Sequence, residues 1–231
     1  MNARTAGDFD YDAGGGGYAA ARRTDPRIAA LVHAALGQAR SVLNVGAGAG
    51  SYEPEDRAVT AVEPSASMRA QRPAHLGPAI DATAEHLPFA DASFDAAMAM
   101  VTVHQWADTD QGLRELRRVS RGPVVVLTFD GDALDLLWLA DYMPELITAE
   151  RQRFPAIRHI REVLGGTSMV TPVPVPADCV DGFTEAYFAR LRADLDSGAW
   201  DRRYGLLRTR PEFTVAPAHH CPARLINPED C

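Results

Sequence analysis

The sequence feature that most constrains the fold is an apolar run that ends in three alternating glycines. Residues 41–51 read SVLNVGAGAGS, with glycine at positions 46, 48 and 50. A short apolar run followed by such a turn is typical of a buried parallel strand beneath a nucleotide-like ligand. Because glycine lacks a Cβ, its backbone adopts positive φ values and lets ligand atoms approach the main-chain N–H groups. We therefore predict a cofactor site at the carboxyl end of this strand.

The spacing of the glycines separates two classes of cofactor site. The dinucleotide fingerprint G-x-G-x-x-G needs its third glycine at position 51, where this chain has Ser51. The pattern here is G-x-G-x-G, which disfavours a nicotinamide oxidoreductase. One strand further on, Glu63 follows the apolar run 58–62 and precedes Pro64. An acid at that place accepts hydrogen bonds from both hydroxyls of a ribose, so the two features together predict a nucleoside pocket.

Three successive segments resemble, in order and spacing, the motifs of class I S-adenosylmethionine-dependent methyltransferases: VLNVGAGAGSYEP, AVEPSASM and ATAEHLPFADASFDAAMAM. The resemblance is strongest to the small-molecule methyltransferases of the "type 11" group. It implies an α/β fold, a Rossmann-like seven-stranded sheet with helices on both faces and a helical cap. It also implies an enzyme that uses S-adenosyl-L-methionine, releases S-adenosyl-L-homocysteine and needs no metal.

The resemblance also implies which residues hold the cofactor. The glycine turn would lie against the cofactor, Glu63 would bind its ribose, and the stretch that begins at Thr83 would cup its adenine ring. In the family an acid often stands at the position of Thr83 and meets the adenine amine, whereas here a hydroxyl has to serve. The expected cofactor-binding residues are Gly46, Ala47, Gly48, Gly50, Glu63, Pro64, Thr83, Ala84, Glu85 and Val101.

His104 is the first candidate catalytic residue. It lies just beyond the apolar strand expected at 93–100, at the edge of the sheet where ligands bind in this fold. The unperturbed imidazole pKa of about 6.5 suits a general base near neutrality. A role in orienting the acceptor and a purely structural role, as a hydrogen bond to a loop carbonyl, stay open.

Tyr11 and Tyr18 are the other candidate catalytic residues, and they flank the glycines at positions 14–17. In this methyltransferase class the segment before the first helix often folds over the cofactor. We therefore expect residues 1–25 to form a flexible N-terminal lid. A mobile terminus with surface tyrosines is the alternative.

The remaining patterns predict one methyltransferase domain over residues 26–231, in which 132–165 contributes a helical cap. A helix should begin at Pro26 with Thr24 or Asp25 as its cap and end before Gly37. The prolines of the sixth strand place it near a sheet edge, and the last strand would be the antiparallel one of this class. Strands are expected at 42–46, 58–62, 77–81, 93–100, 124–129, 169–175 and 223–226.

Composition restricts the partners. The formal charge of −8 and the absence of lysine argue against a general nucleic-acid binder. No apolar run is long enough for a membrane helix or a signal peptide, and the three cysteines have no metal-binding spacing. We expect a cytoplasmic monomer or homodimer that methylates a small-molecule acceptor. The alternative is a non-catalytic methyltransferase-fold protein that binds a ligand or a partner subunit.

Overall fold

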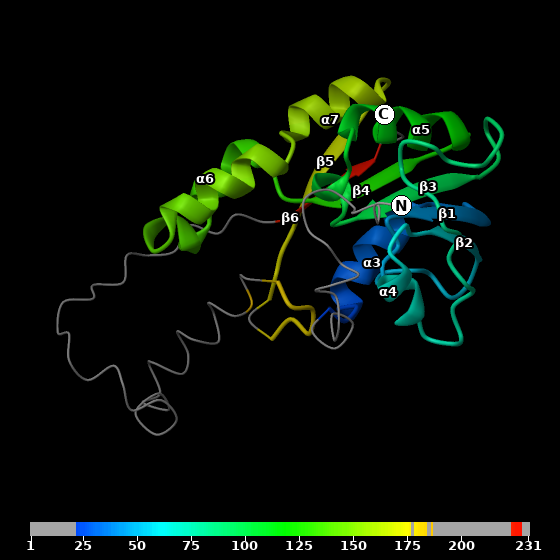
Figure 1. Cartoon of the computed structure of the whole chain (residues 1–231), viewed down its shortest axis with the longest axis horizontal. Helices are drawn as coiled ribbons and strands as arrows, with labels where there is room; N and C mark the ends of the chain where they lie inside the picture. The colour runs from blue at the N-terminus through cyan, green and yellow to red at the C-terminus, as the bar shows by residue number, and fades with distance from the viewer. Residues whose placement is uncertain (1–21, 177, 184–185, 187–222, 228–231) are drawn as a thin grey trace.

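The protein is a three-layer α/β structure in which helices cover both faces of one sheet (Figure 1). The structure is a computed structural model and describes residues 22–176, 178–183, 186 and 223–227. In the described part the sheet has six strands in the order β2-β1-β3-β4-β6-β5. The strands are β1 (Ser41–Val45), β2 (Ala58–Val62), β3 (Ala96–Met100), β4 (Val124–Thr128), β5 (Met169–Val173) and β6 (Ala223–Asn227).

Strand directions explain where a ligand can bind. β1 pairs in parallel with both β2 and β3, and β3 pairs in parallel with β4. The chain thus moves from β1 to one side of the sheet and then crosses to the other side. This reversal opens a crevice at the carboxyl ends of β1 and β3, the usual ligand position in an open α/β sheet. As predicted, β6 is antiparallel to its neighbours and β5 lies at the edge.

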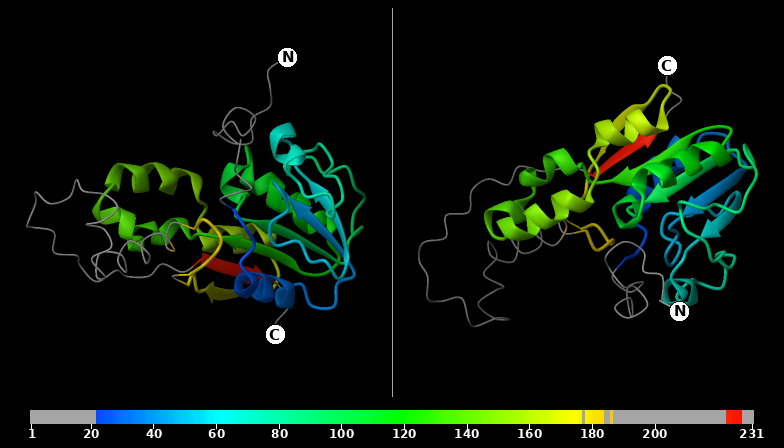
Figure 2. Two further views of the ribbon diagram at one scale, coloured as in Figure 1. Left: turned by 90° about the horizontal axis from the view of Figure 1, so that it is seen from below. Right: turned by 45° about the horizontal axis from the view of Figure 1, so that its top comes forward.

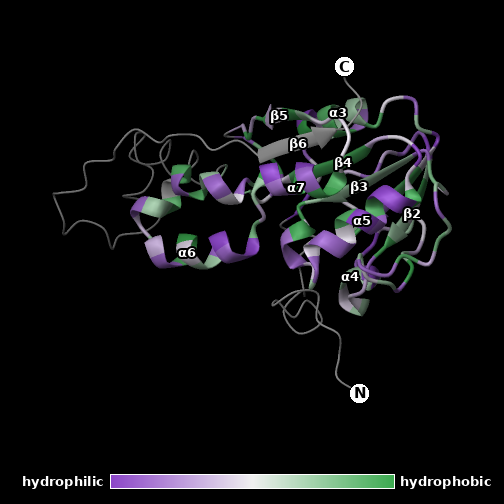
Figure 3. Cartoon of the chain, turned by 90° about the horizontal axis from the view of Figure 1, so that it is seen from above, coloured by the Kyte–Doolittle hydropathy of each residue, from purple (hydrophilic) through white to green (hydrophobic). Residues whose placement is uncertain are grey.

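The two faces of the sheet carry separate hydrophobic cores. Successive strand residues point to opposite faces, so Val42 packs in one core while Leu43 packs in the other. α3 covers the first face, and α5 and α7 cover the second; Figure 3 shows the outer side of these two helices. The helices are α3 (Pro26–Ala35), α4 (Ala66–Ala70), α5 (Thr109–Val119), α6 (Pro144–Arg153) and α7 (Ile157–Leu164), with 3₁₀ turns η1 (Val103–Gln105), η2 (Gly131–Leu136) and η3 (Trp138–Asp141).

The strand expected at 77–81 is reduced to a single bridge. Ile80 pairs with Val62, and its N–H donates to the carbonyl of Ala61 at 2.8 Å. The ladder extends no further because Pro78 has no N–H to donate and Gly77 has little strand preference. The prediction of seven strands was therefore wrong by one for the described chain, although the fold class is confirmed.

The segment 132–165 divides into two parts. α7 belongs to the layer over the sheet, where Ile157, Ile160 and Leu164 are buried in the second core. α6 stands away from the sheet, as both views of Figure 2 show, whereas Leu134 of η2 is buried in the first core. The buried part of α6 is Ile147, which joins the first core. This outlying part is where a cap over an acceptor would have to arise.

A buried carboxylate joins α3 to a distant segment. Of the two predicted caps, Thr24 and Asp25, it is Asp25 that caps the helix, by accepting from the N–H of Arg27 at 3.0 Å. Its other oxygen accepts from the N–H of Val180 at 3.1 Å. Asp25 is fully buried, and hydrogen bonds from the Arg27 side chain hold the pKa of its carboxyl well below the usual range. The bonds fix residues 178–183 beside the first helix.

We predict that Asp25→Ala lowers the free energy of unfolding by about 1–3 kcal/mol at pH 7, because it leaves buried N–H groups without an acceptor. A carboxyl with a depressed folded pKa stabilises the fold above its unfolded pKa of about 3.9. The difference between variant and wild type should therefore shrink as the pH falls below about 4. Urea unfolding at pH 7 and pH 3 measures it.

Asp178→Ala is the matched control, since Asp178 also pairs with Arg27, at 2.7 Å, but is exposed. It should leave stability nearly unchanged. Equal effects of the two substitutions would contradict the structural role of Asp25.

Candidate cofactor and active site

The glycine turn after β1 forms one wall of a cavity at the predicted edge of the sheet. Gly46 and Gly48 line this cavity, and both have positive φ, 66° and 52°. A Cβ on Gly46 would lie 2.1 Å from Oγ1 of Thr102, so no larger residue fits between β1 and the end of β3. A Cβ on Gly48 would lie 3.3 Å from the Met68 methyl. The turn thus keeps this wall of the cavity free of side chains.

Gly50 serves a different purpose from the one expected. It is not among the residues that line this cavity. Its φ is 98°, and a Cβ there would lie 2.3 Å from Cδ1 of Leu76. The third glycine therefore allows the segment around Leu76 to pack over the turn. We find no place for Gly50 in direct contact with a ligand in this cavity.

Glu63 stands at the carboxyl end of β2 and faces the glycine turn. One carboxylate oxygen accepts from the N–H of Gly48 at 2.8 Å, and the other accepts from the N–H of Ser65 at 2.9 Å. The side chain is buried, and burial raises the pKa of its carboxyl. Each carboxylate oxygen can accept a second hydrogen bond. Glu63 can therefore hold the turn in place and bind two ligand hydroxyls; Pro64 lines the cavity beside it.

A buried polar network connects the strand before the glycine turn to the chain that follows it. Asn44, a polar residue inside the buried strand β1, donates from Nδ2 to Glu53 at 2.9 Å. Glu53 forms a buried salt bridge with Arg72, whose Nη2 lies 2.9 Å from its Oε2. The three side chains connect β1, the chain after the turn and the chain after α4. An asparagine in an apolar strand was the one sequence signal for this network.

The end of β3 provides the opposite wall. Met100, Val101, Thr102, Gln105 and Trp106 line the cavity there. Val101 has a φ of 53°, an unfavourable value for a β-branched residue. Such backbone strain concentrates at functional sites, where the surrounding structure maintains it. Val101 was predicted to contact the cofactor, whereas Thr102 and Trp106 were not identified from the sequence.

The stretch predicted to bind the adenine, which begins at Thr83, is separated from the cavity by Trp106. Ala84 is buried, and Glu85 accepts from the N–H of Asp108 at 3.1 Å. Neither of these residues nor Thr83 is among those lining the cavity. A Cβ on Gly112 would lie 2.5 Å from the Trp106 ring and 3.1 Å from Ala84, so the indole packs against α5 close to this stretch. In this structure Trp106 forms the wall on that side.

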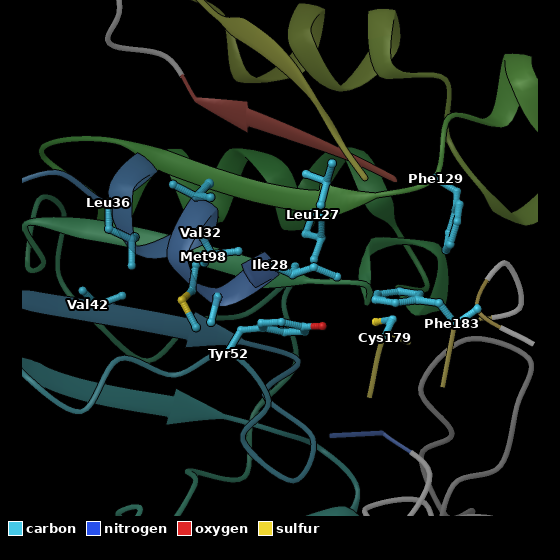
Figure 4. Close-up of a cluster of buried hydrophobic side chains, with 14 of the residues drawn as sticks. Ile28, Val32, Leu36, Val42, Tyr52, Met98, Leu127, Phe129, Cys179 and Phe183 are labelled. Atoms are coloured by element: carbon cyan, nitrogen blue, oxygen red, sulfur yellow. The ribbon is translucent and has the colours of Figure 1, made fainter. Parts of the chain in front are cut away.

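A cluster of three polar side chains closes the cavity near α3. Tyr52 follows the glycine turn, is fully buried and donates from its hydroxyl to Asp181 at 2.5 Å. Burial, aided by Asp181, raises the pKa of this hydroxyl, which stays protonated. Arg22 donates to the other oxygen of Asp181 at 2.5 Å. Figure 4 shows the Tyr52 hydroxyl pointing toward the segment that carries Cys179 and Phe183. Residues far apart in sequence are thereby joined at the cavity.

The cavity has opposite charges in its walls. Among the described residues that line it, Arg22 is the one cation and Glu63 the one anion. Arg22 is held by Asp181 and lies 4.9 Å above the centre of the Phe183 ring. An elongated ligand with hydroxyls at one end and a carboxylate at the other fits this arrangement. No pattern in the sequence singled out Arg22 or Asp181.

His104 lies beside the cavity and does not line it. Its ring stacks on Phe154, with a centroid distance of 4.1 Å and an interplanar angle of 20°. Burial lowers the pKa of the imidazole to about 3, and Arg153 and Arg22 contribute. The unperturbed value of about 6.5, on which the role of general base was based, applies to a solvated ring, whereas this ring is buried. A neutral ring of such low pKa is a weak base near neutrality.

Tyr11 and Tyr18, the remaining candidate catalytic residues, lie outside the described residues. Among the described residues, no group of three or more His, Cys, Asp and Glu side chains is arranged to hold a metal ion. None of the described helices has the length and apolar character needed to cross a membrane.

We predict that His104 increases the sensitivity of the fold to acid. The unfolded chain protonates His104 near pH 6.5, whereas the folded chain does so near pH 3. The contribution of the neutral His104 to the free energy of unfolding is fully present above about pH 6.5 and is lost as the pH falls toward 3. His104→Phe keeps an aromatic ring against Phe154 and removes this titration. Urea unfolding at pH 7.5 and 5 should show a smaller loss in the variant, and His75→Phe, at an exposed histidine, should behave like wild type. Equal losses in His104→Phe and wild type would contradict the prediction.

Comparison with known proteins identifies the domain. Residues 43–126 match the family model of a methyltransferase domain, a span that includes the glycine turn, Glu63 and the end of β3. Comparison with curated proteins finds no match.

Solved structures share the fold at low sequence identity. A putative methyltransferase from an antibiotic biosynthesis pathway of Anabaena variabilis has a TM-score of 0.69 and 24% identity, covering 90% of this chain and 99% of that one. A possible histamine N-methyltransferase from Thermotoga maritima has a TM-score of 0.55 and 18% identity, covering 87% and 86%.

The [4+2]-cyclase SpnF also has this fold, with a TM-score of 0.55, 20% identity and coverage of 87% of this chain and 78% of its own. The fold by itself therefore does not specify the reaction. The family match and the shared fold agree: residues 43–126 match a methyltransferase domain, and the described chain has the fold of S-adenosylmethionine-dependent methyltransferases.

Proposed function

We propose that this protein transfers a methyl group from S-adenosyl-L-methionine to a small-molecule acceptor by in-line displacement. The observation that carries the proposal is a cavity whose glycine wall is free of side chains and whose two charged residues have opposite sign. The family match supports methyl transfer, and the small acceptor is our extension of it.

We assign the parts of the cofactor to the residues that fit them. Glu63 would accept hydrogen bonds from the ribose hydroxyls. Arg22 would pair with the carboxylate of the methionine part, and Gly46 and Gly48 would lie against its chain. Trp106 would cover the adenine. Thr83, Ala84 and Glu85 stay candidates for the adenine if the indole moves.

The chain's own residues have to orient and shield, because the bound cofactor supplies a methyl group that is already activated as part of a sulfonium. Alignment of the acceptor is then the main contribution that a protein can make. The apolar side chains of Met100, Val101 and Trp106 exclude water from the cavity wall that follows β3. His104 is buried, neutral and not part of the cavity lining, which favours a structural role over the roles of general base and acceptor-orienting group.

We predict that Glu63→Ala weakens the binding of S-adenosyl-L-homocysteine by about 5- to 150-fold, the equivalent of about 1–3 kcal/mol for hydrogen bonds to a charged acceptor. Gly48→Val should weaken binding at least as much, because its side chain would enter the cavity. Calorimetric titration measures both affinities. Glu145→Ala, at an exposed acid on α6, is the control and should bind like wild type.

Unchanged affinity in Glu63→Ala would contradict the ribose assignment. Methyl transfer itself is tested with labelled cofactor and a panel of small aromatic and amine-containing metabolites. Binding of S-adenosyl-L-homocysteine without transfer to any member would favour the alternative, a methyltransferase-fold protein that binds without catalysis. The cyclase neighbour makes this alternative worth testing.

We also propose that residues 1–25 act as a lid over the bound cofactor, with Tyr18 and Tyr11 facing the acceptor. Closing segments of this kind exclude water and complete a site. Deletion of residues 1–18 should reduce turnover at least tenfold and leave the melting temperature within a few degrees of wild type. Full activity of the truncated protein would contradict the proposal.

A further inference from the structure

Asp181 is a fully buried carboxylate that does not itself line the cavity but bonds to two residues that do. Its Oδ1 accepts from Nε of Arg22 at 2.5 Å. Its Oδ2 accepts from Nη2 of Arg22 at 3.3 Å and from the hydroxyl of Tyr52 at 2.5 Å. Because a buried ion pair often adds little net stability, the position of this pair at the cavity points to a role toward the ligand.

The guanidinium of Arg22 is held on two sides. Asp181 binds the edge that carries Nε and Nη2, and the centre of the Phe183 ring lies 4.9 Å from the central carbon. Phe183 is itself buried and packs edge-on against Phe129, with ring centroids 5.9 Å apart. The Arg22 side chain stays 18% exposed, so a ligand in the cavity can reach it. A side chain that is fixed before binding loses less rotamer freedom when the ligand arrives.

Tyr52 fixes Asp181 in turn. It is one of the few described residues other than glycine with a positive φ, which is 65°. Its N–H donates to Oγ1 of Thr24 at 3.0 Å, and Nε2 of His33 lies 3.1 Å from its carbonyl oxygen. Backbone strain of this kind persists where the surrounding structure maintains it, and it concentrates at functional sites. The strained turn directs the Tyr52 hydroxyl to Asp181 and so connects the glycine turn to Arg22.

The chemistry of these contacts fits a ligand with a carboxylate. A guanidinium carries five N–H donors in a planar fork, so it can bind two carboxylates at once. Asp181 has two opposing effects on a second carboxylate: its charge repels the ligand, whereas its hydrogen bonds hold the fork in place. Charge-assisted bonds from arginine are strong when their geometry is bidentate. We therefore expect the orientation of Arg22 to outweigh the repulsion.

We propose that Asp181 and Tyr52 are positioning residues for the methyl donor: Tyr52 fixes Asp181, and Asp181 holds Arg22 where it binds the carboxylate of the methionine part. The inference rests on the proposed function and extends the cofactor site to residue 181, beyond the matched span 43–126. Asp181 then controls the recognition of one group of the ligand and has no effect on the binding of the adenosine part.

The test compares two ligands that differ only in the carboxylate: S-adenosyl-L-homocysteine and S-adenosyl-3-thiopropylamine, in which a hydrogen replaces it. Calorimetric titration of the full chain should show that wild type binds the first ~10-fold or more tightly, the size expected from hydrogen bonds between charged groups. Asp181→Asn keeps the shape of the side chain and removes its charge, so this preference should fall ~5-fold or more. Asp178→Asn, at an exposed acid of the same segment, should keep the wild-type preference.

Tyr52→Phe provides a second variant that leaves the Asp181 charge in place. It removes only the hydroxyl that bonds to Asp181, and the preference should fall ~2- to 5-fold. The melting temperature of each variant shows that the chain still folds.

A double-mutant cycle tests whether Asp181 acts through Arg22. Arg22→Gln should abolish most of the preference for S-adenosyl-L-homocysteine. Asp181→Asn added to Arg22→Gln should then change the preference by less than about twofold, because the group that it positions is already absent. A merely structural role of Asp181 would weaken the binding of both ligands equally, and that result would overturn the inference.

The outcomes separate the two proposals. If wild type binds neither ligand, the proposed function fails, and the inference fails with it. If wild type binds both ligands equally, the assignment of the carboxylate to Arg22 and the inference fail together. If wild type shows the preference and both Asp181→Asn and Tyr52→Phe keep or increase it, only the positioning role is overturned.

Discussion

The pair of hydrogen bonds that Glu63 accepts determines the geometry of the site. The bond from Gly48 fixes the glycine turn after β1 against the end of β2, and the bond from Ser65 fixes the start of α4. Removing a carboxylate from water costs free energy. The hydrogen bonds from the N–H groups of Gly48 and Ser65 offset that cost. The same oxygens are the acceptors that we assign to the ribose. One side chain therefore shapes the cavity and supplies its most specific polar group.

The second determinant is the connection between the segment before α3 and residues 178–183. Asp181 accepts hydrogen bonds from Arg22 and from Tyr52, which is the residue that leaves the glycine turn. Asp25 ties the same segment to α3 through Val180. These buried charges are paired, as a dry environment requires. The cavity thus obtains its cationic wall from a contact between residues 159 positions apart.

Local patterns in the sequence were sufficient for the scaffold. The short apolar runs at β1, β2, β3 and β4 are typical of buried parallel strands. The glycine turn directly follows the first of these runs, and Glu63 directly follows the second. The structure places Gly46, Gly48, Glu63, Pro64 and Val101 around one cavity, as this pattern implies. The predicted strand at 77–81 failed because Pro78 removes a donor that a ladder requires.

The remaining features depend on contacts that sequence spacing does not encode. Gly50 has the same local signature as Gly48, and only the packing of Leu76 shows that it serves another purpose. His104 has the expected place in the chain, yet its pKa follows from burial beside Phe154. Arg22, Gln105 and Trp106 reach the cavity through tertiary packing. Side-chain environment therefore had to come from the structure.

The most direct test of the account is calorimetry of the wild-type protein with S-adenosyl-L-homocysteine and, separately, with NAD. The G-x-G-x-G turn, Glu63 and Arg22 together predict one site per chain that binds S-adenosyl-L-homocysteine with micromolar or tighter affinity and does not bind NAD. Binding of NAD in preference, or the absence of binding of S-adenosyl-L-homocysteine, would contradict the central claim that this cavity is a methyl-donor site.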